Sequence, residues 1–176
     1  MRKVSSVLLV LVLISFMSAV GFAADRPLIA FSQVAMNHPW RIAMTNDIVY
    51  WAEKLGVDLI WNEGEADAAI QLTKVRDLLL QEPDALIMSP FQATALDPVK
   101  EMCDEAGIPL VTIDRSIDSE PGTGMYISFI GKDNTRIARE LGEFVANYLY
   151  ELNGEYKGNI VEIQEAVGSS ATIERY

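Results

Sequence analysis

Trp40 and Arg41 are adjacent side chains whose types suit ligand binding. They follow Pro39, at a point where a helix is predicted to begin. An indole can stack on the apolar C–H face of a saturated ring, and a guanidinium group can donate to the hydroxyl groups around it. The pair therefore suits a polyhydroxylated ring such as a monosaccharide. The alternative is that Trp40 packs under the helix and Arg41 pairs at the surface.

Asp114 and Arg115 form a second pair, directly after the apolar run Leu110–Ile113. A carboxylate accepts from hydroxyl groups and a guanidinium donates in a fixed fork, so the two can satisfy one polyol together. The alternative is a structural ion pair that closes a strand. Nearby Asp118 is expected to be a solvated loop acid. Arg175 is either a second guanidinium donor or an ordinary surface arginine.

The sequence offers little for catalysis. His38 is the only histidine, and no Gly-x-Ser-x-Gly motif places a serine nucleophile. The turn after the first apolar run has no glycine, and no phosphate-binding loop occurs. One histidine and one cysteine far apart in the chain do not form a metal site. We therefore expect a binding protein rather than an enzyme, with no cofactor and no metal.

Charge and composition narrow the class further. Half of the residues are hydrophobic, so the chain can bury a core. Lys and Arg total 14 against 25 Asp and Glu, a formal net charge of −11, and no basic run occurs. Because neutralising phosphates takes a clustered basic surface, we expect no nucleic-acid partner. The single cysteine, Cys103, cannot form an internal disulfide and is expected to be a small buried hydrophobe.

The amino terminus has the order of a secretory signal peptide. Arg2 and Lys3 precede an uncharged stretch from Val4 to Ala24 that ends in small residues. We expect residues 1–23 to be the signal, with cleavage near Ala23, and the mature protein to be soluble, exported and not inserted in the membrane. A retained membrane anchor is the alternative. Cleavage removes two bases and no acid, so the mature net charge is 12 minus 25, or −13.

Apolar runs alternate with segments of helical spacing along the rest of the chain. The predicted strands are Leu28–Ser32, Val57–Trp61, Ala85–Ser89, Leu110–Ile113, Tyr126–Ile130 and Ile160–Ile163. Helical faces between them include Ile42 to Leu55, Ile70 to Leu79, Val99 to Ala106 and Ile137 to Leu152. The expected helix stops are Gly56, Pro83, Gly107 and Gly154. This alternation predicts an α/β fold, a parallel sheet with helices on both faces.

In such a sheet the ligand crevice lies at the carboxyl ends of the strands. Trp40 and Arg41 follow the first predicted strand, and Asp114 and Arg115 follow the fourth. The sequence therefore predicts that both pairs share one rim of the sheet.

Several segments, in this order and spacing, carry a resemblance to a known family. They are Leu28–Gln33, Asn37–Trp40, Gly107–Arg115, Asp133–Asn134 and Val161–Arg175. They resemble the periplasmic sugar-binding proteins of ABC transporters, of the ribose- and galactose-binding type. Phe31–Val34, Trp40–Arg41 and Asp114–Asp118 are most similar to the galactofuranose-binding branch. The resemblance implies the type I fold of periplasmic binding proteins, with two lobes that close on a monosaccharide and then dock on a membrane permease.

The resemblance also implies roles for single residues. Trp40 resembles the stacking aromatic, and Asp114 and Arg115 resemble a paired hydroxyl clamp. The remaining implied ligand contacts are Ser32, Gln33 and Arg41 from the first loop, Ser89, and Arg175 from the second lobe. Ser89 stands where some relatives have an asparagine. His38 replaces an asparagine of ribose binders, which argues against ribose.

The chain departs from the family in length, since members run to roughly three hundred residues in two lobes. The resemblance implies a first lobe over residues 24–130 and the start of a second over 131–176. We therefore expect a gene fragment, or a chain that a partner completes, with weak or no sugar binding. The helix from Asn134 to Leu152 should carry an exposed apolar patch. A periplasmic sugar sensor for a chemoreceptor or kinase is the alternative function; a sugar-responsive repressor domain is disfavoured by the signal peptide.

Overall fold

The computed structural model describes residues 26–164 and 166–176, so the predicted signal peptide lies outside the described residues. A five-stranded parallel sheet has the order β2-β1-β3-β4-β5. The strands are β1 (Leu28–Gln33), β2 (Asp58–Glu63), β3 (Ala85–Met88), β4 (Leu110–Ile113) and β5 (Tyr126–Ile130). These strands confirm the first five sequence predictions. The strand order reverses at β1, which lies between β2 and β3, and such a switch point opens a crevice at the strand ends.

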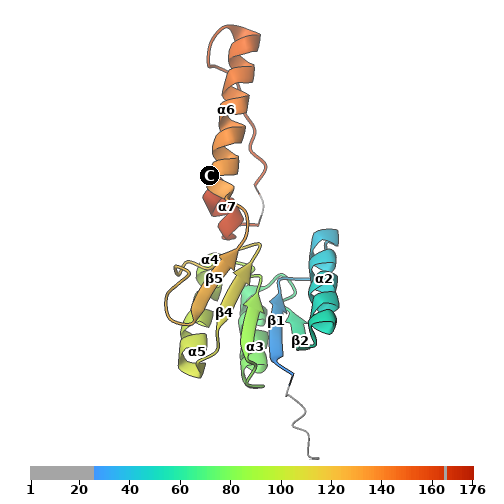
Figure 1. Cartoon of the computed structure of the whole chain (residues 1–176). Coiled ribbons are helices and arrows are strands. Elements are labelled where there is room, and N and C mark those ends of the chain that lie inside the picture. The colour runs from blue at the N-terminus through green and yellow to red at the C-terminus, as the bar shows by residue number, and fades with distance from the viewer. Residues whose placement is uncertain (1–25, 165) are drawn as a thin grey trace, which may run out of the picture.

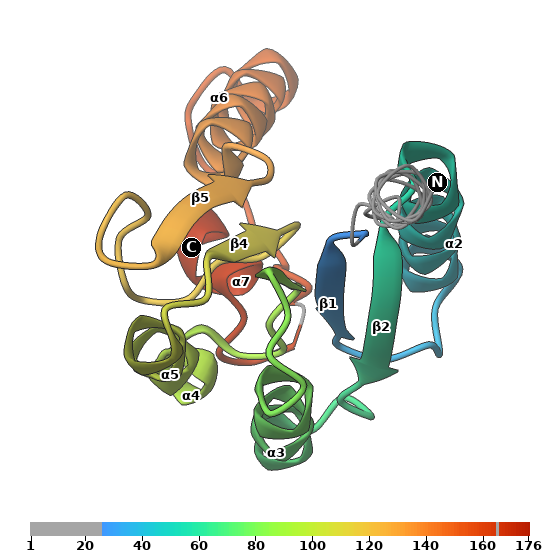
Figure 2. The ribbon, with the colours of Figure 1, turned by 60° about the horizontal axis from the view of Figure 1, so that its bottom comes forward.

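Helices lie on both faces of the sheet, as predicted (Figure 2). One face is covered at β1 and β2 by α2 (Pro39–Leu55), and the other by α3 (Ala68–Leu79), α4 (Ala93–Leu96) and α5 (Pro98–Ala106). Beyond β5 come α6 (Asn134–Asn153) and α7 (Ser170–Arg175). Neither short helix, α4 nor α7, was predicted from the spacing.

The core fills the layer between the sheet and α3 and α5. Its fully buried side chains include Val75, Leu86, Val99, Leu110 and Tyr126. Cys103 is also buried there, as predicted, and burial raises the pKa of its thiol to about 12. The side chains of α3 and α5 that contact the strands recur at helical spacing, which is why periodicity located these helices.

The helix stops lie where turn chemistry predicts them. Gly56, Gly107 and Gly154 are the carboxyl caps of α2, α5 and α6, all in the left-handed conformation that glycine adopts most easily. Asp67 caps the other end of α3 by accepting from the amides of Ala69 and Ile70. Asp67 thus fixes the start of α3 at the strand-end rim, whereas Gly56 and Gly107 end α2 and α5 near the opposite edge of the sheet, where β2 and β4 begin.

The packed face of α2 differs from the expected one. Its buried side chains are Arg41 and Thr45, whereas Ile42, Trp51 and Leu55 are exposed. Hydrophobic spacing alone therefore misjudged the rotation of this helix, because a buried ion pair and hydrogen bonds hold its first turns against the sheet.

The region around α6 extends away from the sheet (Figure 1). The predicted patch is confirmed: Leu141, Phe144 and Tyr148 are 64%, 69% and 53% exposed. The sixth predicted strand, Ile160–Ile163, is wrong for this structure, since the segment runs beside α6 without strand pairing. A strand needs a neighbouring ladder of hydrogen bonds, and β5 is the last strand of the described sheet on that side. Within the described residues no helix is both long and apolar enough to cross a membrane.

Candidate functional site: a polar pocket at the strand ends

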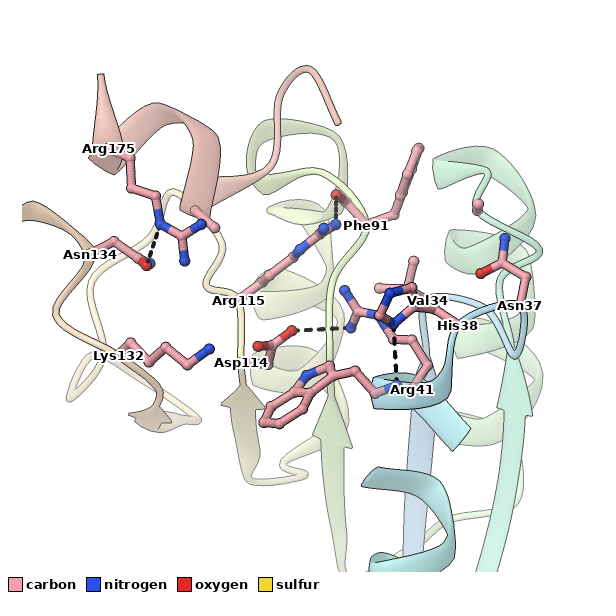
Figure 3. A pocket seen from close by; sticks show the side chains of 13 residues that line it. Val34, Asn37, His38, Arg41, Phe91, Asp114, Arg115, Lys132, Asn134 and Arg175 are labelled. Atoms are coloured by element: carbon pink, nitrogen blue, oxygen red, sulfur yellow. Dashed lines mark hydrogen bonds and ion pairs between the residues drawn. The ribbon is translucent and has the colours of Figure 1, made fainter. Parts of the chain in front are cut away.

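A pocket of about 390 Å³ lies at the carboxyl ends of the strands (Figure 3). Its walls come from the segments after β1, β2, β3, β4 and β5 and from α7. The lining residues are Val34, Asn37, His38, Trp40, Arg41, Ala66, Phe91, Asp114, Arg115, Lys132, Asn134, Ala171 and Arg175. The two pairs singled out from the sequence therefore share one rim, as predicted.

Asp114 and Arg41 form a salt bridge across the floor of the pocket. The distance from Arg41 Nη1 to Asp114 Oδ2 is 3.2 Å, and the two side chains are only 9% and 17% exposed. Asp114 has a φ of 65°, a left-handed conformation that aspartate tolerates better than most residues. The alternative of a surface-paired Arg41 is wrong, because its partner is the carboxylate after β4. Asp114 is thus held at the rim with part of its surface still open to the pocket.

Arg115 leaves this turn in a different direction from Asp114. It is buried, and its Nη1 donates to the carbonyl oxygen of Phe91, 3.1 Å away, in the loop after β3. Figure 3 shows the two side chains diverging from the end of β4, one toward Arg41 and the other toward Phe91. Asp114 pairs with Arg41 and Arg115 bonds the loop after β3, so the two residues do not point at one place as the predicted hydroxyl clamp would; their contact with a ligand stays a prediction.

Trp40 presents its indole to solvent at the mouth of the pocket. The side chain is 51% exposed, so the alternative of a tryptophan packed under its helix is wrong. His38 caps α2: its Nδ1 accepts from the Trp40 amide at 3.2 Å, which fixes the helix start that carries the indole. The Lys132 ammonium lies 5.0 Å from the centroid of the indole ring, within the range of a cation–π contact.

Arg175 reaches the pocket from α7. Its Nε donates to Asn134 Oδ1 at 2.9 Å, and Asn134 Nδ2 in turn donates to Glu174 Oε2 at 2.8 Å. Asn134 is buried, and α7 is also attached to the sheet side through Ser116, whose amide donates to Ser170 Oγ at 2.9 Å. The arginine predicted from the far end of the chain therefore does meet the other site residues.

The other three predicted contacts, Ser32, Gln33 and Ser89, lie beneath the pocket and are fully buried. Ser89 Oγ accepts from Arg41 Nη1 at 2.7 Å. Gln33 Oε1 accepts from the same nitrogen at 3.3 Å and its Nε2 donates to Thr45 Oγ1 at 3.2 Å. These buried side chains thus bond other residues beneath the pocket. Direct contacts between them and a ligand stay predictions.

Sequence reasoning omitted Lys132 and Asn134 from the site. Both follow β5 and line the pocket. The signal was present, because every polar segment after a parallel strand meets the same rim. Phe91 was not predicted either. It holds Arg115 through its backbone carbonyl, and the sequence does not distinguish one backbone carbonyl from another.

The arrangement combines one aromatic face with a carboxylate acceptor and several cationic donors. Within a chain of net charge −11, the pocket lining holds Arg41, Arg115, Lys132 and Arg175 against Asp114. Such a site can stack an apolar ring face and exchange hydrogen bonds with hydroxyl groups on its edge. An open parallel sheet with this pocket at its switch point defines a class: α/β domains that bind small polar ligands.

The comparisons with known proteins give the family within that class. Residues 29–176 match the model described as the periplasmic binding protein domain, and the chain belongs to this family. Its architecture is the type I fold of periplasmic binding proteins, which confirms the fold expected from the resemblance.

Three proteins illustrate the similarity. The galactofuranose-binding protein YtfQ of Escherichia coli (strain K12) is 34% identical over 90% of this chain and 48% of its own length. The arabinose-transporter binding protein of Shewanella sp. ANA-3, solved with L-arabinofuranose, is 28% identical, with a TM-score of 0.70 over 84% of this chain and 47% of that one. The fructose-binding periplasmic domain of a hybrid two-component system is 30% identical, with a TM-score of 0.74 over 86% and 47%. The chain thus spans about half the length of these relatives.

Proposed function

We propose that this chain is the sugar-capturing part of an exported solute-binding protein. In this proposal a monosaccharide binds between two lobes in the periplasm and is delivered to an ABC transporter permease. The relatives support a sugar as the ligand class, since they bind galactofuranose, arabinofuranose and fructose. Binding without turnover, rather than an enzymatic activity, fits a family of substrate-binding proteins.

One observation carries the proposal: the exposed Trp40 indole and the Asp114–Arg41 pair line the same pocket. A sugar ring stacked on Trp40 would lose water from its apolar face, and its hydroxyl groups would meet acceptors and donors that are already fixed. Because the salt bridge and the Arg115 bond exist without ligand, little ordering is left to be done on binding.

The sequence led us to expect weak or no sugar binding by the 176-residue form, and of these two outcomes the pocket already present supports weak binding. The exposed Trp40 and Arg175 leave the pocket open to water. Two-lobed relatives are about twice as long, and closure of a second lobe would remove that water and strengthen the polar contacts. The assignment of residues 131–176 to the start of a second lobe belongs to this proposal.

The test is thermal unfolding of the 176-residue chain against rising concentrations of galactose, arabinose, fructose and ribose. Stabilisation by at least one of them is expected, with a midpoint in the millimolar range. Trp40→Leu should abolish the effect, and Trp51→Leu should leave it intact, because Trp51 is equally exposed on α2 but does not line the pocket. No stabilisation by any of the sugars would contradict the proposal, and nanomolar binding would contradict its weak-binding part.

A second candidate function is sugar sensing. It is favoured by the likeness to the fructose-binding periplasmic domain of a two-component system. Both functions use the same pocket, so the site does not discriminate between them. The neighbouring genes do: a permease and its ATPase support import, whereas a kinase or chemoreceptor supports sensing.

A further inference from the structure

Gln71 is a fully buried polar side chain on α3, below the pocket floor. It does not line the pocket, yet it makes hydrogen bonds to two different strand ends. Its Nε2 donates to Ser89 O at 2.9 Å and to Ser32 Oγ at 3.3 Å, and its Oε1 accepts from the Phe91 amide at 2.9 Å. A single side chain therefore joins α3 to the ends of β1 and β3.

Two of the arginines that line the pocket, Arg41 and Arg115, donate to the loop that Gln71 holds. Arg41 Nη1 donates to Ser89 Oγ at 2.7 Å, and Arg115 Nη1 donates to Phe91 O at 3.1 Å. Gln71 bonds the other polar groups of these same residues, the Ser89 carbonyl and the Phe91 amide. Hydrogen bonds on both sides of a short loop fix its backbone, so Gln71 holds the loop to which the two guanidinium groups donate.

Gly64 lets Gln71 reach this place. A Cβ on residue 64 would lie 2.5 Å from Gln71 Cβ and 2.9 Å from its Cγ, closer than real Cβ atoms approach. The turn after β2 therefore passes directly against α3 at Gln71, and any side chain at position 64 would push the helix and its glutamine away.

We propose that Gln71 is the positioning residue of the sugar site, which sets the guanidinium groups of Arg41 and Arg115 through the loop Ser89–Phe91. The inference rests on the proposed function for its purpose, but the positioning itself does not require a ligand. Gln71 acts without touching the sugar, so its loss changes the order of the two arginines before it changes anything else.

The experiment compares Gln71→Met with Asn62→Leu in the full chain. Asn62 Nδ2 also joins a strand to α3, by donating to Lys74 O at 2.9 Å, and its Oδ1 accepts no hydrogen bond from any described residue, the loop Ser89–Phe91 included. The readout is the arginine Nε–H region of the NMR spectrum. We expect the Arg41 and Arg115 signals to shift or broaden in Gln71→Met and to keep their positions in Asn62→Leu. Unchanged arginine signals in a folded Gln71→Met protein, or equal changes in both variants, would overturn the proposal.

Two further variants cover the case in which Gln71→Met does not fold. Gly64→Ala keeps the glutamine but displaces it, and should reproduce the change in the arginine signals. Gln71→Glu keeps an acceptor for the Phe91 amide but places a buried carboxylate oxygen against Ser89 O in place of the donor, so it should also change the arginine signals. Native arginine signals in both would count against the role of Gln71.

Sugar binding is the second readout, and it separates the two proposals. Where the wild-type chain binds a sugar, Gln71→Met should weaken that binding about tenfold or more, and Asn62→Leu less than about twofold. If the arginine signals respond as expected but the wild type binds no sugar, the positioning role stands and the proposed function fails.

Discussion

The strand-end rim and the α6 region differ in which side chains they bury: the rim buries polar side chains, whereas α6 leaves apolar side chains exposed. At the rim, polar side chains such as Gln33, Gln71 and Ser89 are completely buried and hydrogen-bonded. Along α6, apolar side chains such as Leu141 and Phe144 remain mostly exposed. An apolar groove of about 610 Å³ runs between α6 and the segment that includes Ile160–Ile163. The rim is therefore ordered by contacts already present, whereas α6 displays a face suited to packing against something else.

The rate of thiol modification should show the largest difference between the core beneath the rim and the α6 region. Cys103 is completely buried in the core, and its raised pKa keeps the thiol protonated at pH 8. A cysteine placed at exposed position 141 (Leu141→Cys, in a Cys103→Ala background) should react with a thiol reagent at least about a thousandfold faster. The measurement is the rate of modification in native buffer. Comparable rates would mean that the core opens as readily as α6.

Replacing one leucine in each region by alanine should give the next largest difference, measured as the loss in free energy of unfolding. Leu86 on β3 is fully buried and Leu141 on α6 is 64% exposed. We expect Leu86→Ala to lower the free energy of unfolding by about 2–5 kcal/mol, because it leaves a cavity in the core. Leu141→Ala should change it by less than about 0.5 kcal/mol. Urea denaturation of both variants checks this, and a large loss from Leu141→Ala would show that α6 is packed in solution.

One arginine–acid pair from each region allows a comparison of a nearly buried ion pair with an exposed one. The Asp114–Arg41 pair is nearly buried, whereas the Arg136–Glu140 pair on α6 is 69% and 64% exposed. Asp114→Asn removes the carboxylate charge from a nearly buried ion pair and should cost about 3 kcal/mol of unfolding free energy. Glu140→Gln should cost less than about 0.5 kcal/mol, since water screens the exposed pair. Equal losses in urea denaturation would contradict the contrast between the regions.

Replacing Lys132 should change the stability only slightly and should alter the fluorescence of the neighbouring tryptophan. Its ammonium lies 5.0 Å from the Trp40 ring, and Lys54 lies 5.4 Å from Tyr50 in a similar contact. Lys132→Met should cost less than about 1 kcal/mol and shift the emission of Trp40 in a Trp51→Phe, Trp61→Phe background. Lys54→Met is the control and should leave that emission unchanged. An unaltered spectrum in Lys132→Met would mean that the ammonium does not sit on the indole in solution.

Most of the fold could be predicted from the sequence because its signals are local. Apolar runs bounded by turn residues gave five strands, and glycines with left-handed backbones marked three helix ends. The sixth expected strand, Ile160–Ile163, shows the limit of this reasoning. A run can have strand composition, yet a strand forms only where another strand supplies hydrogen bonds.

The site could be predicted as a set of residues but not as a network. The position of Trp40 and Asp114 after parallel strands placed them on one rim. The sequence could not show that Asp114 pairs with Arg41 while Arg115 bonds the Phe91 carbonyl, because both contacts join loops distant in the chain. Gln71 was missed for the same reason: a single glutamine on the apolar side of a helix gives no sign of its partners.

The most direct test of the central claim is an NMR titration of the chain with a monosaccharide such as arabinose or galactose, at concentrations on the order of tens of millimolar. We expect the indole N–H of Trp40 and the Nε–H groups of Arg41 and Arg115 to shift together with one midpoint. The indole signals of Trp51 and Trp61, which do not line the pocket, should stay in place in the same spectra. Shifts confined to Trp51 or Trp61, or none at Trp40 and the arginines with any sugar, would contradict the account.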